Sequence, residues 1–284
     1  MKKVPTAREL EFKAAAERPP RPQKILQPCG EVMAMLARRG LRPSKARLDL
    51  PFPENLDEQK ASRLAELLGH YAFRLFLRGA ILHPEGFAPG EVTRYVKKSR
   101  SKAYAELLVN LGLAERMSRS RYRLFRSAKS FGGTLEWYVA RELARRFWFD
   151  VAAGVKFHAR GVGGDFDVVA SAEGKLIYFE LKSSPPKNLE AREVASFFDR
   201  VQLLRPDITL FVVDTALRLS DKVLPLLATE LERRRDGVSV MPRRIERELW
   251  ALTPHLYAVN GKMDLVANIG RALAEGLLAL APPL

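Results

Sequence analysis

The stretch DFDVVASAEGKLIYFELKSS, residues 165–184, contains two apolar runs separated by a short polar turn. Each run is long enough for a β-strand and is rich in the β-branched and aromatic residues that favour strands. Glu173 and Gly174 suit the two central positions of a tight turn, because Gly adopts a positive φ angle without strain. The stretch therefore predicts an antiparallel hairpin, in which Ala172 and Lys175 are the first cross-strand pair.

This register sorts the hairpin's side chains onto two faces, because successive residues of a strand point to opposite sides. On one face Asp167 lies opposite Glu180, and Asp165 lies opposite Lys182. Directly opposed side chains have Cβ atoms about 4.5–5.5 Å apart, so three carboxylates and one ammonium are predicted to cluster. The other face is apolar and pairs Phe166 with Leu181, Val168 with Phe179, and Ala170 with Ile177.

Two opposed carboxylates repel each other, so one of them must raise its pKa or bind a cation. Carboxylate oxygens suit Mg²⁺ or Mn²⁺, and a nearby lysine can orient a water molecule or neutralise developing charge. A register slip of one residue would place the charges on the apolar face, which the pattern disfavours. The simpler alternative is a salt bridge between Glu180 and Lys182 on a solvated edge strand.

The segments around the hairpin predict an α/β unit. Residues 134–150 have helical spacing, residues 151–159 read as a strand, residues 188–204 as a second helix and residues 208–214 as a buried strand. The predicted order is helix, strand, strand, strand, helix, strand. Further along the chain, an amphipathic helix over 221–237, a strand within 248–261 and a final helix on the sheet are expected.

The combination of Asp167, the run Glu180-Leu181-Lys182 and a preceding helix that carries Glu136 resembles the PD-(D/E)XK nuclease superfamily. That superfamily includes restriction endonucleases, archaeal Holliday-junction resolvases and the nuclease domains of some CRISPR-associated effectors. The segment that begins GGTLEWYVA looks especially like the effector nucleases. The resemblance covers roughly residues 132–215, under a third of the chain.

The resemblance implies a restriction-endonuclease-like αβββαβ core with a mixed sheet. Asp167 and Glu180 would be ligands of Mg²⁺ or Mn²⁺, Lys182 the catalytic lysine, and Glu136 a residue that reaches the site through a metal-bound water. Asp165 is an additional acid that could share the ligand role, and Phe166 stands where the motif often has proline. For Glu136 the alternative is an ordinary exposed residue in the first turns of a helix.

Positive charge is concentrated in the first part of the chain. The net charge is +15; residues 1–130 hold 27 Lys or Arg against 13 Asp or Glu, whereas residues 131–284 hold 21 against 20. Such asymmetry favours two modules, the first of which faces a polyanion such as nucleic acid. A generally basic, well-solvated protein is the alternative.

Residues 1–54 read as a basic, proline-rich arm with a short helix near 30–40, and residues 55–128 as a helical domain. A helix over 55–80, a second helix from Pro89, a break at 97–99, a third helix and a basic hairpin resemble a winged helix-turn-helix over about 57–126. In such folds one helix enters the major groove and the wing contacts the backbone. A domain that mediates dimerisation is the alternative. The predicted contacts are Arg94, Lys97, Lys98, Arg100 and Lys102 at the turn and recognition helix, and Arg116, Arg119, Arg121, Arg123 and Arg126 on the wing.

The small, polar segment 127–133 marks a boundary, so the third predicted domain is a nuclease-like unit over 129–284. A single cysteine excludes an intrachain disulfide, and neither a secretory signal nor a membrane span is recognisable, so a cytoplasmic protein is expected. The predicted function is metal-dependent endonucleolytic hydrolysis, with DNA favoured over RNA as substrate. A DNA-binding protein with a degenerate nuclease fold, or a ribonuclease, is the alternative, and a homodimer is left open.

Overall fold

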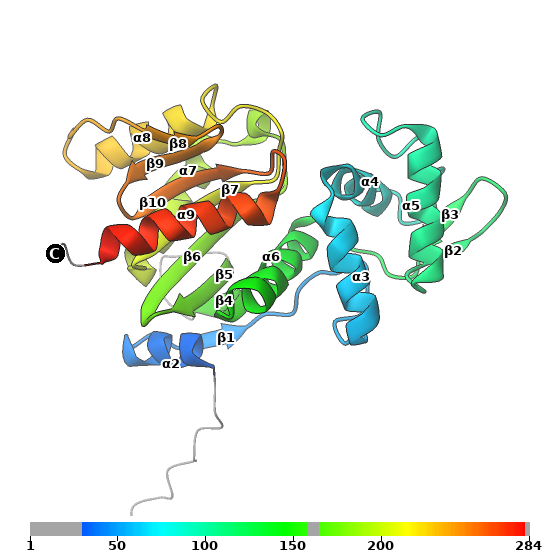
Figure 1. Cartoon of the computed structure of the whole chain (residues 1–284), viewed down its shortest axis with the longest axis horizontal. Coiled ribbons are helices and arrows are strands. Elements are labelled where there is room, and N and C mark those ends of the chain that lie inside the picture. The colour runs from blue at the N-terminus through cyan, green and yellow to red at the C-terminus, as the bar shows by residue number, and fades with distance from the viewer. Residues whose placement is uncertain (1–29, 158–164, 282–284) are drawn as a thin grey trace, which may run out of the picture.

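The structure, a computed structural model, describes residues 30–157 and 165–281 and shows an α/β protein (Figure 1). In the described part of the chain, eight strands form one mixed sheet in the order β1-β4-β5-β6-β7-β10-β9-β8. Strands β6, β7 and β10 run parallel to one another, and the other neighbouring pairs are antiparallel. The strands are β1 (Pro43–Lys45), β4 (Asp150–Phe157), β5 (Phe166–Ala172), β6 (Lys175–Lys182), β7 (Ile208–Val213), β8 (Arg243–Glu246), β9 (Leu249–Thr253) and β10 (Leu256–Asn260).

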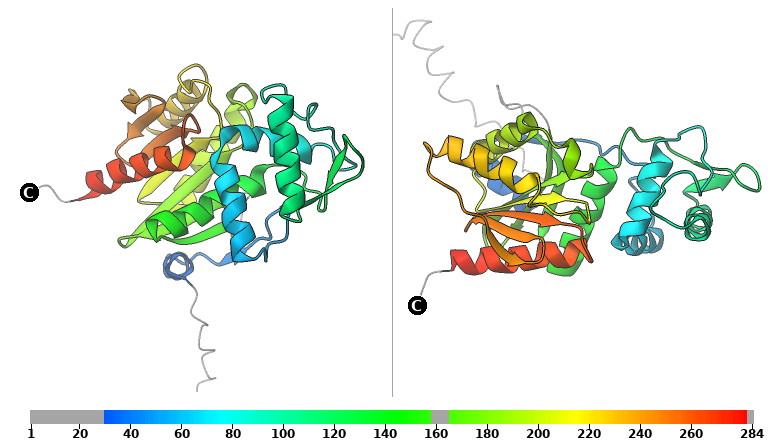
Figure 2. Two further views of the ribbon diagram at one scale, coloured as in Figure 1. Left: turned by 45° about the vertical axis from the view of Figure 1, so that its right-hand side comes forward. Right: turned by 90° about the horizontal axis from the view of Figure 1, so that it is seen from above.

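Helices cover both faces of this sheet (Figure 2). Helices α6 (Gly132–Phe147) and α9 (Leu265–Leu280) pack on one face, where their apolar side chains share a core with Ile177 and Phe179 of β6. On the other face, α2 (Glu31–Arg38), α7 (Ala191–Leu204) and α8 (Val223–Arg234) share a core with Leu176 and Tyr178. Because apolar cores lie on both faces, charged side chains of β6 need partners of their own.

The predicted order of helix, three strands, helix and strand is the observed order of α6, β4, β5, β6, α7 and β7, with a short 3₁₀ turn (Pro186–Asn188) before α7. The predicted hairpin register is also confirmed, from Ala172 opposite Lys175 to Val168 opposite Phe179. Glu173 and Gly174 have φ angles of 52° and 71°, the left-handed values that a two-residue hairpin turn of this kind requires.

The predicted apolar face is wrong at one position. Val168 and Ala170 pack with Phe179 as predicted, but Phe166 packs in the core on the opposite face of the sheet. Its partner across the ladder is Val155 of β4, which lies in that same opposite core. Gly154 precedes Val155 with a φ of 60°, and this left-handed residue interrupts the alternation of side chains at the level of Asp167.

Residues 58–124 form a helical module beside the sheet. It contains α3 (Glu58–Gly69), α4 (Tyr71–Ile81), α5 (Lys98–Asn110) and a hairpin of β2 (Ala114–Arg116) and β3 (Tyr122–Leu124). Its core is aromatic: Phe73 meets Tyr104 edge-on with ring centres 5.1 Å apart, and Phe76 meets Phe87 at 5.8 Å. These contacts fix α5 against α4, so the position of the basic start of α5 is well defined.

The single helix predicted over 55–80 is two helices, because the chain becomes extended at His70. The break leaves the last carbonyl groups of α3 without helical partners. Arg74 supplies the missing hydrogen-bond donor, since its Nη1 donates to the carbonyl oxygens of Leu68 at 2.6 Å and Gly69 at 3.1 Å. A contact from the next helix therefore stabilises a break that local spacing does not reveal.

The helix predicted from Pro89 is absent, and residues 88–97 form turns within the described part of the chain. Helix α5 begins at Lys98, so the predicted break at residues 97–99 is instead a helix start. Here the backbone packs instead: a Cβ added at Gly79 of α4 would collide with the carbonyl oxygen of Val92.

The segment before the helical module belongs to the large sheet. Residues 1–29 of the predicted arm lie outside the described residues. The short helix predicted near 30–40 is α2, which packs on the sheet, and β1 extends the sheet by pairing with β4. Residues 46–53, which we call the strap, then cross α6. The strap contains neither helix nor strand, but Leu50 and Phe52 are buried, and Phe52 contacts Trp137 with ring centres 5.0 Å apart.

A buried ion-pair cluster joins the helical module to the sheet. Asp214 follows β7 directly and is completely buried. Its Oδ1 accepts from Nε of Arg74 at 2.9 Å, and its Oδ2 accepts from Nη2 of Arg78 at 2.8 Å. Gly261, after β10, makes room for this cluster, because a Cβ there would lie 2.9 Å from Asp214 Oδ1. Helix α4 is thereby held at the carboxyl ends of the parallel strands.

The last part of the chain contains more structure than its sequence predicts. Residues 248–261 supply two antiparallel strands, β9 and β10, rather than one. The final helix is α9, and it lies on the sheet as expected. Among the described residues, none of the helices is both long enough and apolar enough to cross a membrane.

Candidate active site

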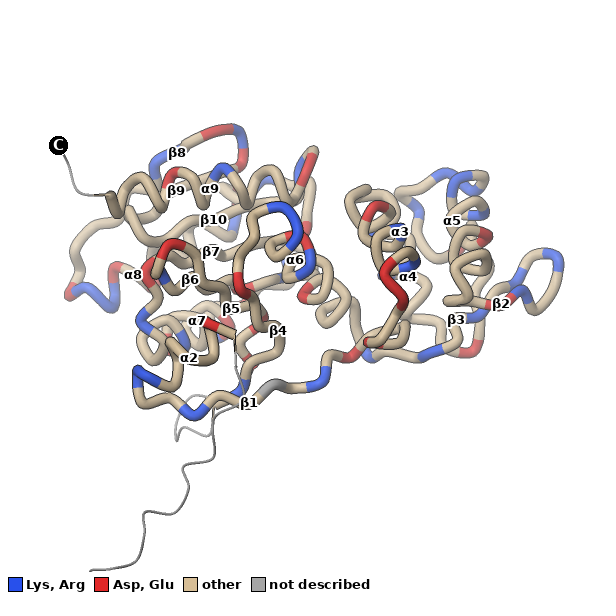
Figure 3. The backbone as a smooth tube through the Cα atoms, turned by 60° about the horizontal axis from the view of Figure 1, so that its bottom comes forward, with Lys and Arg blue, Asp and Glu red and all other residues tan. Residues whose placement is uncertain are grey.

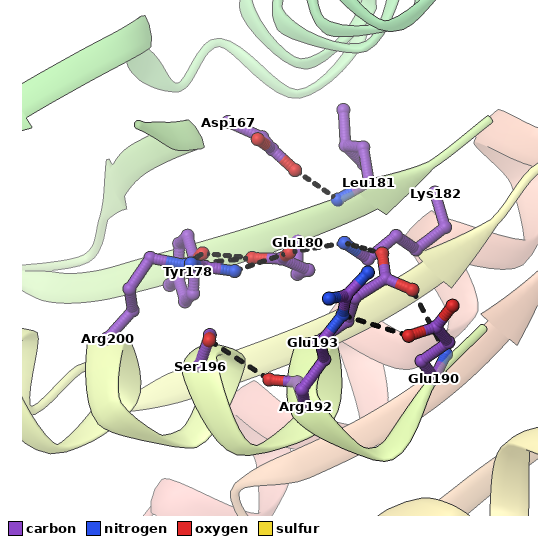
Figure 4. A network of polar contacts seen from close by, with 10 residues as sticks. All are labelled: Asp167, Tyr178, Glu180, Leu181, Lys182, Glu190, Arg192, Glu193, Ser196 and Arg200. Carbon is purple, nitrogen blue, oxygen red and sulfur yellow. Dashed lines mark hydrogen bonds and ion pairs between the residues drawn. The ribbon is translucent and has the colours of Figure 1, made fainter. Parts of the chain in front are cut away.

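The predicted catalytic residues lie at one end of the sheet, where β6 ends and the helices α6 and α7 begin. Glu180 and Lys182 are among the last three residues of β6, Asp167 lies on the neighbouring β5, and Glu136 lies near the start of α6. Figure 4 shows the side chains of Asp167, Glu180 and Lys182 in this region. The amino ends of helices carry partial positive charge, so two helix starts at this place favour a bound anion.

Glu180 is the most completely bonded of these residues. It is 2% exposed and faces α7, from which Arg200 donates Nη2 to Oε1 at 2.7 Å and Nε to Oε2 at 3.2 Å. The hydroxyl of Tyr178 also donates to Oε2, and Nζ of Lys182 lies 3.1 Å from Oε1 (Figure 4). Two positive charges and a hydroxyl thus offset the cost of burying this carboxylate.

Lys182 lies between two carboxylates. In addition to Glu180, it contacts Oε1 of Glu193 on α7 at 3.4 Å, and its side chain is 19% exposed. Burial disfavours the ammonium, but the charges of Glu180, Asp167 and Glu193 outweigh burial and raise the pKa of Lys182. Lys182 therefore carries a positive charge at neutral pH.

Asp167 terminates the hairpin ladder. The last regular pair is Val168 with Phe179, and beyond it Oδ2 of Asp167 accepts the backbone N–H of Leu181 at 2.6 Å. Burial raises the pKa of Asp167 well above its ordinary value, with further contributions from the charges of Glu180 and Glu136. The side chain thus takes a backbone hydrogen bond at the position where the two strands stop pairing.

Glu136 is half-buried on α6. Burial, followed by the charges of Asp165 and Glu180, raises the pKa of Glu136 to about 7. Its alternative interpretation, an ordinary exposed helix residue, does not fit this environment. At neutral pH the carboxyl of Glu136 is divided between its protonated and ionised forms.

Asp165 does not lie beside Lys182, so the predicted pair is wrong. Asp165 precedes the first residue of β5, its side chain is 44% exposed, and its Oδ1 lies 3.2 Å from Nζ of Lys156 on β4. The hairpin register does not extend to this residue, because regular pairing between β5 and β6 already ends at Val168. The predicted pairing of Asp165 with Lys182 is therefore not formed, but the charge of Asp165 still acts on Glu136.

The residues present match a divalent cation in chemistry but not in their present arrangement. Asp167, Glu180 and Glu136 offer only oxygen donors, the type that Mg²⁺ and Mn²⁺ prefer, and the raised pKa values of Asp167 and Glu136 indicate negative charge that a cation would stabilise. Yet, within residues 30–157 and 165–281, no group of three or more His, Cys, Asp or Glu side chains is placed to hold a metal ion. A cation would require side-chain rearrangement around Glu180.

Sequence reasoning missed three residues of this network: Tyr178, Glu193 and Arg200. Tyr178 lies two positions before Glu180, so strand alternation alone places it on the same face. Arg200 lies three positions after Phe197, within the apolar stripe of a predicted helix, and it is only 8% exposed. A charged residue within such a stripe indicates a buried partner, and this signal could have identified Arg200 as a partner of Glu180.

The predicted nucleic-acid contacts fall into two groups. The first group lies around the start of α5 (Figure 3), and its members are exposed to solvent. In this group Arg94 stacks on the exposed ring of Tyr95 at 5.0 Å from its centre. We call this surface the α5 basic surface; it comprises Arg94, Lys97, Lys98, Arg100 and Lys102.

On the β2–β3 hairpin most arginines are already engaged within the protein. Arg123 pairs with Glu115 at 2.6 Å, and Arg116 pairs with Glu106. Arg121 donates to the carbonyl of Gly86 at 3.0 Å. Arg119 is exposed at the tip of the hairpin. Most hairpin arginines therefore already have a partner within the protein, and the side chains of Arg116 and Arg123 are still 52% and 45% exposed.

The raised pKa of Glu136 predicts a pH-dependent stability. A carboxyl whose pKa is higher in the folded protein binds its proton more tightly there than in the unfolded chain. The free energy of unfolding should therefore fall as pH rises from the ordinary value of 4.5 to about 7, and this contribution should not change further above that range. The free energy of unfolding is measured by urea denaturation without metal at several pH values between about pH 5 and pH 8. Its decrease with pH should be smaller in Glu136→Gln, whereas Glu66→Gln, on the exposed surface of α3, should leave that decrease unchanged. An unchanged slope in Glu136→Gln would contradict the assignment.

Comparisons with known proteins show only distant similarity. No protein-family model matches the chain, and a search of the curated proteins finds no match. Among solved structures, the chain is similar to protein VC1899 from Vibrio cholerae, with 15% identity, a TM-score of 0.48, and coverage of 86% of this chain and 62% of that one. It is also similar to Can2 from Sulfobacillus thermosulfidooxidans, solved in complex with cyclic tetra-adenylate, with 17% identity, a TM-score of 0.43, and coverage of 87% and 60%. The chain thus spans about three fifths of the length of each of these structures.

Proposed function

We propose that this protein is a metal-dependent nuclease that hydrolyses phosphodiester bonds of DNA and is built on a restriction-endonuclease-like αβββαβ core. The observation that carries the proposal is the convergence of Asp167, Glu180 and Lys182 where β5 and β6 stop pairing, with Glu136 contributing from α6. Perturbed titratable residues that come together from separate elements are characteristic of catalytic sites.

In this proposal Asp167 and Glu180 would hold Mg²⁺ or Mn²⁺, and Glu136 would act on the cation through a water molecule. When bound, the cation supplies Lewis acidity to the phosphate and a lowered pKa to a bound water. The chain itself supplies the ammonium of Lys182, whose raised pKa keeps it charged to stabilise negative charge on the phosphate. Glu136, with a pKa of about 7, suits the transfer of a proton from water at neutral pH.

The helical module would supply the binding energy for the polyanion. Its order of three helices and a hairpin supports a winged helix-turn-helix-like module, in which α5 enters a DNA groove. The exposed cations at the start of α5 and Arg119 at the hairpin tip would contact phosphates. This arrangement favours duplex DNA over duplex RNA as the ligand. The major groove of DNA is wide enough for a helix, whereas the deep, narrow major groove of duplex RNA does not admit one.

A cleavage assay tests this function directly. The purified chain should cut DNA in the presence of Mn²⁺ or Mg²⁺ and should leave it intact with EDTA, because cleavage in the proposal depends on the cation. The assay should include duplex DNA, single-stranded DNA and structured RNA at matched length. Cleavage of RNA alone would make the protein a ribonuclease, and cleavage that persists in EDTA would contradict metal dependence.

The α5 basic surface predicts a separable loss of binding. Replacing both Lys98 and Lys102 with Glu should weaken duplex DNA binding by more than tenfold at low salt and reduce the slope of log K against log salt by about 2, since two phosphate contacts are lost. Arg123→Glu should have a smaller effect, because Arg123 is paired with Glu115. Fluorescence anisotropy over a salt series would measure both effects. Equal losses in the two variants would contradict a specific role for this surface.

One observation favours a second candidate function, a non-catalytic nucleic-acid-binding protein. Arg200 and Lys182 already neutralise Glu180, as cations of the protein would in a nuclease fold that no longer uses a metal. This candidate predicts salt-dependent DNA binding without cleavage under any divalent cation. The same gel assay, with binding followed in parallel, separates the two candidates.

A further inference from the structure

The bonding of Glu180 is complete before any metal ion arrives. An ionised carboxylate offers about four lone-pair positions on its two oxygens. Oε1 accepts a hydrogen bond from Nη2 of Arg200 at 2.7 Å and forms an ion pair with Nζ of Lys182 at 3.1 Å. Oε2 receives Nε of Arg200 at 3.2 Å and the hydroxyl of Tyr178. A divalent cation can therefore bind Glu180 only if one of these four donors leaves.

Three of the four donors are held firmly in place. Tyr178 is completely buried, and Arg200 is 8% exposed. Nε of Arg200 also lies 3.0 Å from the hydroxyl oxygen of Tyr178, so the guanidinium has a second fixed partner. Moving either group would leave a buried polar atom without a hydrogen bond, which is costly. The guanidinium is moreover planar and grips both carboxylate oxygens at once.

Lys182 is the donor that can leave. Its side chain is 19% exposed, and its ammonium sits on a flexible stem with several accessible rotamers. It also has a second acceptor within reach, because Oε1 of Glu193 lies 3.4 Å from Nζ (Figure 4). Transfer of the ammonium from Glu180 to Glu193 would free one lone-pair position of Glu180 Oε1 and keep Lys182 paired.

Glu193 is itself fixed in position by the start of α7. Its Oε2 accepts the backbone N–H of Glu190 at 3.0 Å, while the side chain of Glu190 accepts from the backbone N–H of Glu193, so the two form a capping box. The two oxygens of Glu193 thus have separate roles: one caps the helix, and the other faces Lys182. A carboxylate held in this way is ready to receive the ammonium without reorganisation.

We propose that Glu193 is a positioning residue for Lys182, and that it receives the ammonium when a divalent cation takes the lone pair that Lys182 occupies on Glu180. The inference rests on the proposed function, because it concerns the same cation. It assigns to α7 a part in cation binding that the motif residues alone do not contain. In this proposal Arg200 and Tyr178 keep their hydrogen bonds to Glu180 when the cation binds.

Glu193→Gln is the matched substitution. Glutamine also serves in a capping box, so the amide oxygen can keep the hydrogen bond to Glu190 N–H. The amide NH₂ then faces Lys182, where it offers a donor instead of an acceptor. We expect Mn²⁺ to bind this variant about fivefold more weakly in isothermal titration calorimetry, the loss of one partly exposed ion pair. The thermal unfolding midpoint without metal should stay close to that of the original protein.

Two controls separate this role from general electrostatics. Glu190→Gln makes the same charge change at the same helix start, but Glu190 pairs with Arg192 at 2.8 Å and not with Lys182, so Mn²⁺ affinity should change little. In a Lys182→Met background, Glu193→Gln should have no further effect on Mn²⁺ affinity, because Glu193 acts through Lys182.

The outcomes distinguish the inference from the function on which it rests. Unchanged Mn²⁺ affinity in Glu193→Gln, an equal loss in Glu190→Gln, or a persistent effect in the Lys182→Met background would each overturn the role of Glu193 while leaving the nuclease proposal intact. An original protein that binds no Mn²⁺ and cleaves nothing would overturn both. A loss confined to Glu193→Gln, and dependent on Lys182, would establish the role.

Discussion

Replacing Lys182 with alanine is expected to reduce metal-dependent DNA cleavage by a factor of roughly 10²–10⁴, the range seen when a positioned acid–base or charge-stabilising group is removed. Lys182 is paired with Glu180 and is more exposed than Arg200, the other cation on that carboxylate, so it is the one better placed to reach a substrate phosphate. Steady-state or single-turnover cleavage of a labelled duplex with Mn²⁺ would measure the loss.

Folding and DNA binding should survive this substitution. The pairs that Lys182 forms are partly exposed, and Arg200 still neutralises Glu180 after its removal. Lys175→Ala, at the opposite end of the same strand, serves as the control and should cleave normally. Circular dichroism and anisotropy would verify fold and binding. Full cleavage by Lys182→Ala would refute the assignment of the catalytic lysine.

Asp214→Asn is expected to have the largest effect on stability, a loss of about 3–5 kcal/mol in the free energy of unfolding. The carboxylate is fully buried and pairs with Arg74 and Arg78, and Arg74 is itself fully buried. An amide cannot neutralise two guanidinium groups, and it turns a donor toward one of them. Urea denaturation would measure the difference.

The matched control is Asp199→Asn. Asp199 also pairs with an arginine, Arg234, at 2.6 Å, but its side chain is 49% exposed. An exposed pair contributes less than about 1 kcal/mol. A similar loss in the two variants would mean that burial does not set the strength of the Asp214 cluster. The total free energy of unfolding of an ordinary domain is only about 5–15 kcal/mol, so a loss of this size is a large fraction of it. Because the Asp214 cluster joins the helical module to the sheet, the two parts should also unfold less cooperatively in the Asp214 variant.

The parts of the fold that could be predicted from the sequence depend on local chemistry. The hairpin register follows from Glu173 and Gly174 at the turn and from strict alternation on either side, and both are local properties. The helices on either side of the hairpin follow from apolar spacing. The same logic correctly placed Glu180 beside Lys182. For Glu136 the sequence left an ordinary exposed position open, and only its burial in the structure distinguishes the two interpretations.

The errors have a common origin in contacts between distant segments. The break at His70 depends on Arg74, which is held by Asp214, and these residues are far apart in the sequence. Strand β1 has the sequence Pro-Ser-Lys, which carries no apolar signal, yet it pairs with β4. Arg200, the partner of Glu180 on β6, comes from α7, and its only local signal is a charge within an apolar stripe. For the break at His70 and for β1 the local patterns contain no such signal, so the assembled structure alone reveals these contacts.

The strap has a consequence for the architecture as a whole. Strands β1 and β4 are neighbours in the sheet, yet the entire helical module lies between them in the chain. The two ends of the module meet, since Nη1 of Arg126 lies 3.4 Å from the carbonyl oxygen of Phe52. The module is therefore an insertion into a discontinuous domain, and its two ends are close enough to be joined. A fragment that begins at residue 129 would lack α2 and β1 and would expose the edge of β4, whereas excision of the insertion would keep every strand of the sheet but leave Asp214 buried without Arg74 and Arg78.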